Sequence, residues 1–221
     1  MKIDIKGDII PNDYKLIYDW LKWECCCPND VHTAINNAAD GEALDVEINS
    51  FGGYIFAGSE IYTALQSYAK GAVNVVISGL AASAASVIAM AGKVTMSPTA
   101  LMMVHNVSGN CQGDYRDMTK TADTLKTANE SIAAAYVNKS GMELSKALKM
   151  MADETWLSAN KAKEYGLIDD IAFAVNAEPM LNSYSRINAK TLDKLKNIIP
   201  NEKLTASAEL ELLKITGVNL L

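Results

Sequence analysis

Hydrophobic and polar residues alternate in short segments, and longer segments with helical spacing separate them. The alternation predicts strands, which we place at Lys2 to Ile10, Leu44 to Ile48, Val73 to Ser78, Lys93 to Met96 and Ala100 to Val104. Apolar residues three and four positions apart predict helices at Tyr14 to Leu21, Val31 to Ala38, Ile61 to Tyr68 and Asp114 to Val137. A repeated order of strand and helix implies parallel strands with helical crossovers, so we predict an α/β fold.

Residues that end or begin elements refine this picture. The first strand runs into a Pro-Asn-Asp turn at Pro11, so we predict that it is an edge strand. Asp30 is predicted to cap the helix that follows it. The third strand is predicted to turn sharply at Gly79, with a helix beginning near Ser83.

The composition of the chain changes after Phe173. We therefore predict two parts, a domain over residues 1–173 and an extension over residues 174–221. The extension carries two helical patterns, Thr191 to Ile199 and Leu204 to Ile215, separated by a proline. It is predicted either to bind a partner or another copy of the chain, or to pack back on the domain as helices or form a partly ordered tail.

Composition and charge exclude several classes of function. The chain has 221 residues, of which 49% are hydrophobic, enough to bury a core. Its net charge of −6 disfavours nucleic-acid binding, which normally needs a basic surplus. No apolar run approaches the roughly 18–20 residues that cross a bilayer, and the N-terminus alternates charged residues with Ile instead of resembling a signal peptide. We predict a cytoplasmic protein with no membrane or nucleic-acid partner.

Four cysteines are present, three of them consecutive. Neighbouring residues such as Cys25, Cys26 and Cys27 form no unstrained disulfide with each other, and their spacing matches no zinc site. Cys111 lies far away in the sequence. We predict a reduced, partly buried thiol cluster near a turn that ends at Pro28; a metal or redox role is the alternative.

The chain contains two histidines, so any His-dependent reaction uses one of them. His32 begins a polar helix, which is an ordinary surface position. His105 follows the apolar strand that ends at Val104, and the C-terminal ends of strands in α/β sheets are where ligand sites tend to lie. His105 is therefore the candidate, against the alternative of a hydrogen-bonded structural histidine.

Ser83 lies in a run of small residues from Gly79 to Gly92 that directly follows a strand. A serine at a strand-to-helix turn has an exposed hydroxyl, and the next backbone N–H, that of Ala84, can face an oxyanion. A tightly packed buried helix is the structural alternative for such a run.

Gly52 and Gly53 form a second turn of this kind, again between a strand and a helix. Paired glycines permit a positive φ and leave N–H groups free for a ligand. Two N–H groups from two turns make an oxyanion hole. A phosphate-binding loop is the other interpretation, but the lysine and hydroxyl of a P-loop are missing.

A histidine base needs an acidic group to orient its ring. Asp153 and Glu154 precede an apolar Trp-Leu pair, which could hold a carboxylate in a dry pocket beside an imidazole. The sequence pattern alone does not choose between the two.

These motifs, in this order, resemble the proteolytic subunit of the Clp protease family, serine peptidases of the crotonase-like superfold. The resemblance covers roughly residues 3 to 172. It rests on a turn, a serine motif, a histidine motif and a final stretch, which read Ile48-Asn49-Ser50-Phe51-Gly52-Gly53, Gly79-Leu80-Ala81-Ala82-Ser83, Met103-Val104-His105-Asn106, and Trp156-Leu157-Ser158 through Glu164-Tyr165-Gly166-Leu167-Ile168-Asp169.

The resemblance implies a repeated β-β-α fold with a protruding helical handle. It also implies that Ser83 is the nucleophile, His105 the general base, and the N–H groups of Gly53 and Ala84 the oxyanion hole. It implies a homo-oligomeric ring acting on polypeptides, without metal or organic cofactor.

Three departures from the family are visible. The family's acid is Asp, which aligns with Glu154; we favour Glu154 as the third triad member, with Asp153 as the alternative. Phe51 replaces a proline in the first turn. Because the chain opens on its first strand, we expect no counterpart of the segment that contacts the family's ATPase, and that partner is left open.

The Glu-Thr-Trp motif, the short N-terminus and the extension are similar to phage and prophage head-maturation proteases, which trim scaffold or capsid proteins. We therefore expect that activity, in a host cytoplasm. The alternatives are a degradative Clp-type peptidase working with an ATPase, an acyl-CoA hydratase or isomerase of the same superfold, and an inactive assembly module. A Ser-Lys peptidase is disfavoured, since no lysine follows Ser83 before Lys93.

Overall fold

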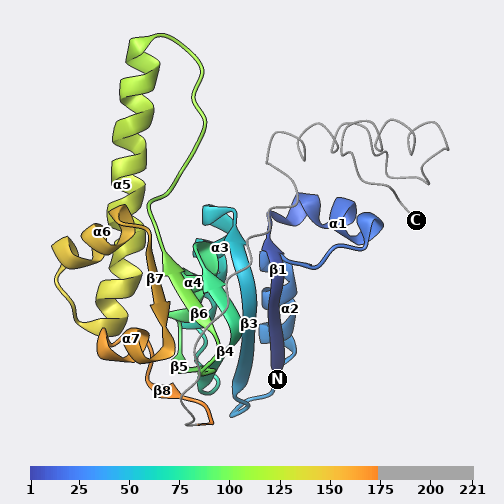
Figure 1. Cartoon of the computed structure of the whole chain (residues 1–221). Helices are drawn as coiled ribbons and strands as arrows, with labels where there is room; N and C mark the ends of the chain where they lie inside the picture. The colour runs from blue at the N-terminus through green and yellow to red at the C-terminus, as the bar shows by residue number, and fades with distance from the viewer. Residues whose placement is uncertain (174–221) are drawn as a thin grey trace. The chain divides into compact units, whose positions relative to one another are not determined.

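The computed structural model describes residues 1–173 (Figure 1). Within these residues two compact units are distinguished: Met1–Asn12 and residues 24–173 belong to one, and Asp13–Trp23 belong to the other. The elements are, in order, β1 (Lys2–Ile9), a 3-10 turn η1 (Asn12–Tyr14), α1 (Lys15–Leu21), β2 (Cys25–Cys26), α2 (Pro28–Asn37), β3 (Leu44–Gly53), α3 (Ile55–Gln66), β4 (Val73–Ala82), α4 (Ala84–Ala89), β5 (Lys93–Met96), β6 (Leu101–Val104), α5 (Tyr115–Ser140), α6 (Leu144–Ala152), β7 (Thr155–Ser158), α7 (Ala159–Glu164) and β8 (Asp170–Ile171).

The strands form one eight-stranded sheet with the order β2-β1-β3-β4-β5-β8, while β6 pairs with β4 and β7. All pairs are parallel except β6 with β7. The predicted α/β fold is confirmed. The predicted edge position of the first strand is wrong, because Cys25 and Cys26 return alongside Asp8 and Ile9 and make β2 the outer strand.

Strand β4 changes its partner along its length. Its first half, Asn74 to Ile77, pairs with β5, and its second half, Leu80 to Ala82, pairs with β6. The chain therefore does not turn at Gly79, contrary to the sequence prediction; the strand continues to the residue before Ser83. Each half finds its own parallel partner, so the backbone groups on both sides of this glycine stay satisfied.

The core lies against the faces of this sheet. Ile5, Ile48 and Ile77 come from β1, β3 and β4 and are fully buried. Every residue of the short helix α4 is buried as well. Its Ala, Ser, Val and Ile side chains are small enough for the helix to sit inside the molecule, which agrees with both interpretations of this run of small residues.

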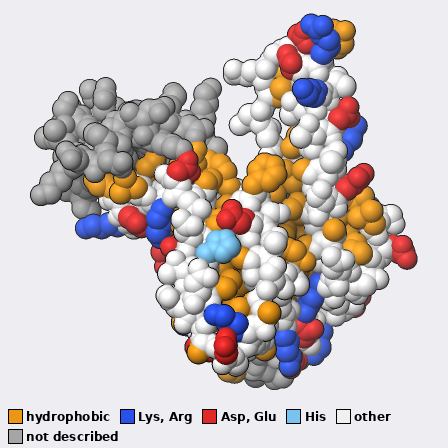
Figure 2. Space-filling model, turned by 180° about the vertical axis from the view of Figure 1, so that it is seen from behind, with side chains coloured by type: hydrophobic (Ala, Val, Ile, Leu, Met, Phe, Trp, Pro, Cys, Tyr) orange, Lys and Arg blue, Asp and Glu red, His pale blue; other side chains and the backbone are white. Residues whose placement is uncertain are grey.

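Helix α5 spans 26 residues and extends beyond the sheet (Figure 1). Asp114 caps its start by accepting a hydrogen bond from the Arg116 N–H at 2.8 Å, and Gly141 ends it in the left-handed conformation. The half near the C-terminus packs on the core through the buried residues Ile132, Ala133, Ala135 and Tyr136, while the first half is largely exposed. Both acidic and basic side chains lie on the projecting end of α5 (Figure 2). This is the predicted handle.

The cysteine cluster forms β2 and the beginning of α2. Cys27 is the N-cap, and Asp30, at the third helical position, accepts a hydrogen bond from the Cys27 N–H at 3.0 Å. Asp30 was predicted as the cap itself; with Pro28 as its first residue the helix starts three residues earlier, since proline is favoured in the first turn. None of the four cysteines forms a disulfide, in agreement with the predicted reduced thiols. Burial raises the pKa of the Cys27 thiol, so it stays protonated and weakly nucleophilic.

In the other unit, α1 ends at Lys22, whose φ of 54° is left-handed. The predicted extension over residues 174–221 lies outside the described residues. Across the described helices, none has the length and apolar character that a bilayer span needs.

Neighbouring positions on β4 provide a test of the core. Ile77 is fully buried, whereas Val76 on the opposite face is 41% exposed. We expect Ile77→Ala to lower the free energy of unfolding by about 2–5 kcal/mol, because it leaves a cavity. Val76→Ala should lower it by less than about 1 kcal/mol. Denaturant titration followed by circular dichroism measures both; equal losses would place the core elsewhere.

Candidate active site

Ser83 occupies a single-residue connection between β4 and α4. Its φ of 54° and ψ of −126° lie in a region that residues with a side chain rarely adopt. Such a conformation costs about 1–3 kcal/mol and persists only where the surrounding structure enforces it. The sharp reversal brings the hydroxyl out at the end of the strand, as the sequence predicted for a nucleophile.

Hydrogen bonds on both sides of Ser83 maintain this conformation. Its N–H donates to the Met103 carbonyl at 3.0 Å. Its carbonyl accepts from the N–H groups of Ser86 and Val87 at 3.0 and 3.3 Å. The first bond ties the turn to β6 and the others tie it to α4, so the strained residue has little freedom to relax.

His105 lies beside this serine because β6 runs parallel to the second half of β4. The register pairs Ala82 with Met103, so the residues just beyond each strand end come together. The Ser83 Oγ is 2.8 Å from the His105 Nε2. With the ring proton on Nδ1, Nε2 accepts the hydroxyl proton, which is the arrangement that activates a serine. The sequence prediction of this pair is therefore matched in space.

The segment after His105 is anchored on its far side. The Asn106 N–H donates to the Met151 carbonyl at 3.1 Å. The Val107 N–H donates to Oδ1 of Asn129 at 2.7 Å. Anchors from α6 and α5 hold the backbone that carries the imidazole, so its position does not depend on the strand alone.

The Gly-Gly turn at the end of β3 touches the serine. Gly52 has a φ of 98°, and a Cβ built on it would lie 2.7 Å from both the Ser83 Cβ and the Ala82 carbonyl oxygen. Only glycine allows the two turns to approach so closely. Phe51, which precedes the turn, is exposed and leaves this approach unchanged.

Ser50 fixes the turn from inside. Its buried hydroxyl donates to the Gly7 carbonyl at 2.6 Å and accepts the Gly52 N–H at 3.0 Å. Directly after the two glycines, the Tyr54 N–H donates to the Ile9 carbonyl at 2.8 Å. Strand β1 therefore holds the turn at both ends.

The two acidic candidates lie in the turn between α6 and β7. Strand β7 runs antiparallel to β6 and pairs Thr155 with Val104. Glu154 precedes Thr155, and His105 follows Val104. The antiparallel register therefore places Glu154 opposite His105. Asp153 ends helix α6 one residue earlier.

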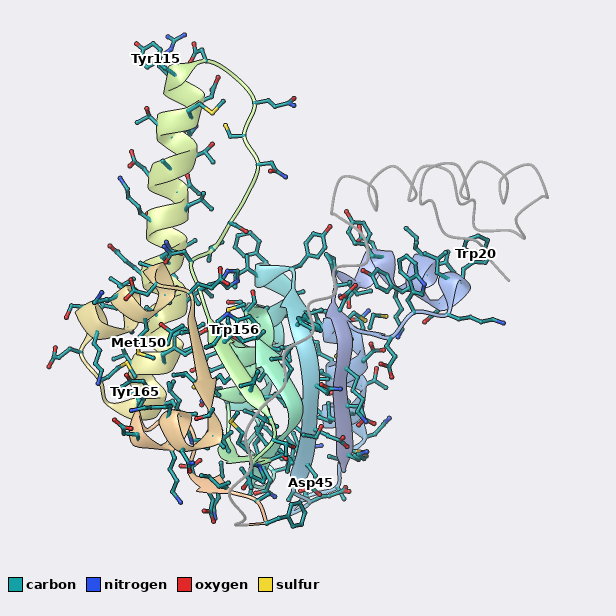
Figure 3. The ribbon with its side chains drawn as sticks, viewed as in Figure 1. Trp20, Asp45, Tyr115, Met150, Trp156 and Tyr165 are labelled. Atoms are coloured by element: carbon teal, nitrogen blue, oxygen red, sulfur yellow. The ribbon has the colours of Figure 1, made fainter. Side chains whose placement is uncertain are left out.

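Both carboxylates are exposed and bound elsewhere in this conformation, so the hypothesis of a dry pocket is wrong. Asp153 forms an ion pair with Lys149 at 2.8 Å. Glu154 accepts a hydrogen bond from Nε1 of Trp156 at 3.4 Å, and Trp156 is labelled on β7 in Figure 3. Within residues 1–173, neither carboxylate makes a hydrogen bond or ion pair with His105. The structure thus brings Ser83, His105 and the Gly-Gly turn together. It shows no contact between His105 and either candidate carboxylate among the described residues.

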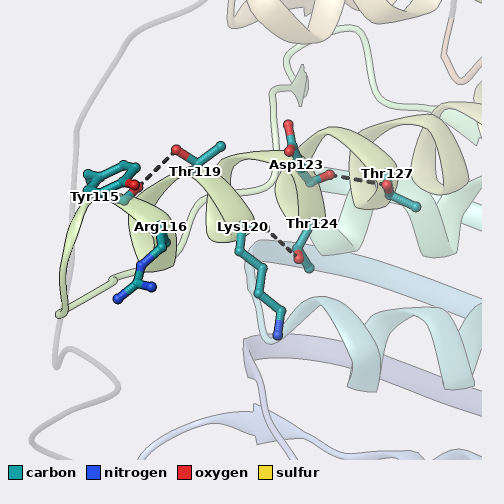
Figure 4. Close-up of a pocket in the computed structure, with 7 residues that line it drawn as sticks. All are labelled: Tyr115, Arg116, Thr119, Lys120, Asp123, Thr124 and Thr127. Atoms are coloured by element: carbon teal, nitrogen blue, oxygen red, sulfur yellow. Dashed lines mark hydrogen bonds between the residues drawn. The ribbon is translucent and has the colours of Figure 1, made fainter.

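Other polar features lie apart from this site. The Nε2 atom of His32 contacts Oε1 of Glu60 at 3.3 Å on the surface, as expected for an ordinary position. Among the described side chains, no three His, Cys, Asp or Glu residues gather as a metal site. A groove of about 510 Å³ runs along the exposed half of α5, and no predicted site residue lines it (Figure 4).

Two residues near the site were not predicted. Ser86 and Tyr136 are buried, and their hydroxyl oxygens lie 2.8 Å apart behind Ser83. Ser86 was visible only as a polar residue in a run of small ones. Tyr136 is 50 residues further along the chain, and no local pattern indicates that it reaches this helix.

Comparison with known proteins agrees with the geometry. The profile of the family described as Clp protease matches residues 32–175. The ATP-dependent Clp protease proteolytic subunit of Bacteroides fragilis is 31% identical over 140 residues, which are 62% of this chain and 67% of that protein. The subunit of the same name from Chlorella vulgaris is 32% identical over 141 residues, 62% of this chain and 70% of that protein. The one from Mesostigma viride is 34% identical over 174 residues, 76% and 75% of the two chains.

The chain therefore belongs to the Clp protease family, a family of serine peptidases. Its parallel sheet and helices agree with the fold that the resemblance implied. The sequence motifs and the comparisons thus identify the same class of protein.

Gly52 provides a test of the close approach between the two turns. We expect Gly52→Ala to displace the Ser83 turn and slow labelling by a fluorophosphonate roughly 10²-fold, the loss that displacements of about 1 Å produce. The control is Gly41→Ala: Gly41 also has a positive φ, 82°, but no atom lies within 4 Å of a Cβ there. Similar labelling rates for the two variants would contradict the proposed contact.

Proposed function

We propose that this chain is a serine endopeptidase in which Ser83 is the nucleophile and His105 the general base. The observation that carries the proposal is the 2.8 Å contact between the Ser83 Oγ and the His105 Nε2 at a strained strand-to-helix turn. As Ser83 Oγ bonds to the peptide carbonyl carbon, its proton passes to Nε2. The C–N bond then breaks, and the amine leaves with that proton. Water hydrolyses the acyl-enzyme with His105 again acting as base.

The oxyanion is proposed to bind to the N–H groups of Gly53 and Ala84. Successive N–H groups of an extended chain point to opposite sides. Since the Tyr54 N–H points at β1, the Gly53 N–H is directed away from β1. Ala84 follows the proposed nucleophile directly, and the close approach of Gly52 to the Ser83 turn supports a shared site for the two donors. Such donors contribute about 10²–10³-fold each.

Glu154 is proposed as the group that orients the imidazole, with Asp153 as the alternative. The sheet register supports Glu154, because it lies opposite His105 across β6 and β7. In this role the Glu154 carboxylate leaves the Trp156 indole and turns to the ring of His105. Asp153 lies at the end of α6 and is paired with Lys149 on that helix.

The finer biological role is also a proposal. We propose a homo-oligomeric ring that encloses its active sites and trims scaffold or capsid proteins of a phage or prophage in the host cytoplasm. The Glu-Thr-Trp motif supports the processing role. The exposed half of α5, with Tyr115 79% and Met118 46% exposed, supports a handle that contacts other subunits (Figure 3).

A degradative peptidase working with an ATPase is the second candidate. The relatives favour it, since they are named as ATP-dependent Clp protease proteolytic subunits. The two roles share the chemistry of Ser83 and differ in what delivers the substrate. The hydratase and inactive-module alternatives instead predict that Ser83 has no role as a nucleophile.

The nucleophile is tested by Ser83→Ala, with Ser78→Ala as control. Ser78 lies on the same strand, and its hydroxyl contacts Glu47 instead of an imidazole. We expect a fluorophosphonate to label the wild type and the Ser78→Ala variant at residue 83. Hydrolysis of casein and of a fluorogenic peptide should fall more than about 10³-fold in Ser83→Ala alone. No labelling of the wild type would reject the peptidase and favour the hydratase.

Co-expression of each variant with a capsid scaffold protein from the same genome extends this test. Trimming of the scaffold by wild type but not by Ser83→Ala, without any ATPase, supports head maturation. Degradation that requires an added Clp ATPase supports the second candidate. Normal assembly with Ser83→Ala, and no trimming by either protein, favours an inactive module.

The two carboxylates are tested by an isosteric pair, Glu154→Gln and Asp153→Asn. We expect Glu154→Gln to lower kcat at least about tenfold, because a neutral amide stabilises the imidazolium poorly; the loss is smaller than the about 10⁴-fold found where such a carboxylate is buried. Asp153→Asn should stay within about twofold of wild type, as for an exposed charge. The opposite ranking would assign the role to Asp153. Steady-state peptide hydrolysis measures both.

A further inference from the structure

Behind the nucleophile, two buried hydroxyls form a chain that ends on the Ser83 backbone. The Ser86 Oγ lies 2.6 Å from the Ser83 carbonyl oxygen and 2.8 Å from the Tyr136 hydroxyl. Ser86 is fully buried, and Tyr136 is 3% exposed. The chain therefore links helix α5, through α4, to the turn that carries the candidate nucleophile.

The direction of the protons in this chain is determined. A carbonyl oxygen can only accept, so the single hydroxyl proton of Ser86 points to Ser83. The Ser86 oxygen must then accept from the Tyr136 hydroxyl. Burial raises the pKa of Tyr136 to about 12, against a smaller lowering by the Ser86 hydrogen bond, so the phenol keeps its proton at neutral pH. The order is Tyr136 O–H to Ser86 O–H to the Ser83 carbonyl.

The bond on the Ser83 carbonyl acts on the N–H of Ala84. These two groups belong to one planar peptide unit and point in opposite directions. Whatever fixes the carbonyl therefore fixes the direction of the N–H. A carbonyl that accepts hydrogen bonds is also polarised, which makes the N–H of the same unit a better donor.

We propose that Ser86 and Tyr136 are positioning residues, which hold the Ser83–Ala84 peptide plane so that the Ala84 N–H points at a developing oxyanion. This inference rests on the proposed function. It adds two residues that touch neither substrate nor reacting atoms, one of them on the helix that forms the handle.

A purely structural role for the pair predicts a different result, so the two roles can be separated. Ser86→Ala leaves the Tyr136 hydroxyl buried without its partner, which destabilises the fold. The double variant Ser86→Ala with Tyr136→Phe removes both hydroxyls, and stability should then return toward wild type. The Ser83 carbonyl keeps its two backbone donors in every variant, so α4 can still form.

The experiment measures kcat and KM for a fluorogenic peptide, the affinity of a peptide boronate that forms a tetrahedral adduct, and the thermal midpoint. We expect Ser86→Ala to lower kcat on the order of tenfold, less than the roughly 10²–10³-fold loss of a whole oxyanion donor. KM should stay within about twofold, because the contact acts only in the transition state. Boronate affinity should fall by the same factor as kcat.

The double variant decides between the two roles. A kcat as low as that of Ser86→Ala, together with a recovered thermal midpoint, supports positioning. A kcat that recovers with the midpoint, or that never falls, overturns it. If Ser86→Ala does not fold, the double variant is compared with Tyr136→Phe. The double variant lacks both hydroxyls, Tyr136→Phe keeps the Ser86 hydroxyl on the Ser83 carbonyl, and neither leaves an unpaired phenol. A lower kcat in the double variant than in Tyr136→Phe supports positioning, and an equal kcat overturns it.

The control is Ser131→Ala, on helix α5, which also carries Tyr136. The exposed Ser131 hydroxyl bonds back to the Thr127 carbonyl, and its removal should leave kcat unchanged. Failure of this inference is distinct from failure of the proposed function. In the first case the wild type is labelled by a fluorophosphonate and Ser86→Ala has wild-type kcat; in the second, Ser83 of the wild type is not labelled at all.

Discussion

The parallel pairing of β6 with the second half of β4 is the constraint on which the site depends. It sets Ala82 beside Met103, and the residues that follow the two strands, Ser83 and His105, then bring a hydroxyl within 2.8 Å of an imidazole. If β4 kept β5 as its partner throughout, these residues would lie apart. The exchange of partners around Gly79 is therefore the topological feature that brings together the residues of the candidate active site.

Close packing supplies the rest of the geometry. Gly52 allows the first turn to touch the second, and Ser50 and the β1 backbone hold that turn in place. The strained Ser83 is held between β6 and α4. Backbone strain is stable only when the neighbours are rigid, and here they are strands of the sheet and a fully buried helix.

Strand alternation and strand-end residues are local signals, and they predicted the α/β class and made Ser83 and His105 candidates. That the two act together was implied by the resemblance to a known family. The sequence predictions were wrong where pairing between distant segments determines the structure. The return of the cysteine segment makes β1 an inner strand, and a new partner carries β4 past Gly79. Nor could the sequence show the contact between Ser86 and Tyr136, since only packing of α5 against α4 creates it. The pattern of residues around Glu154 in the sequence likewise did not predict that its carboxylate is exposed.

The hydrogen bond between the Trp156 indole and Glu154 has a practical consequence. The indole is 42% exposed and lies on β7, beside the strand that leads to His105. Carboxylates quench or shift the emission of a neighbouring indole, so departure of Glu154 from this contact would change the intrinsic fluorescence of the protein. The chain thus carries its own optical reporter for the orientation of that carboxylate, with no dye attached.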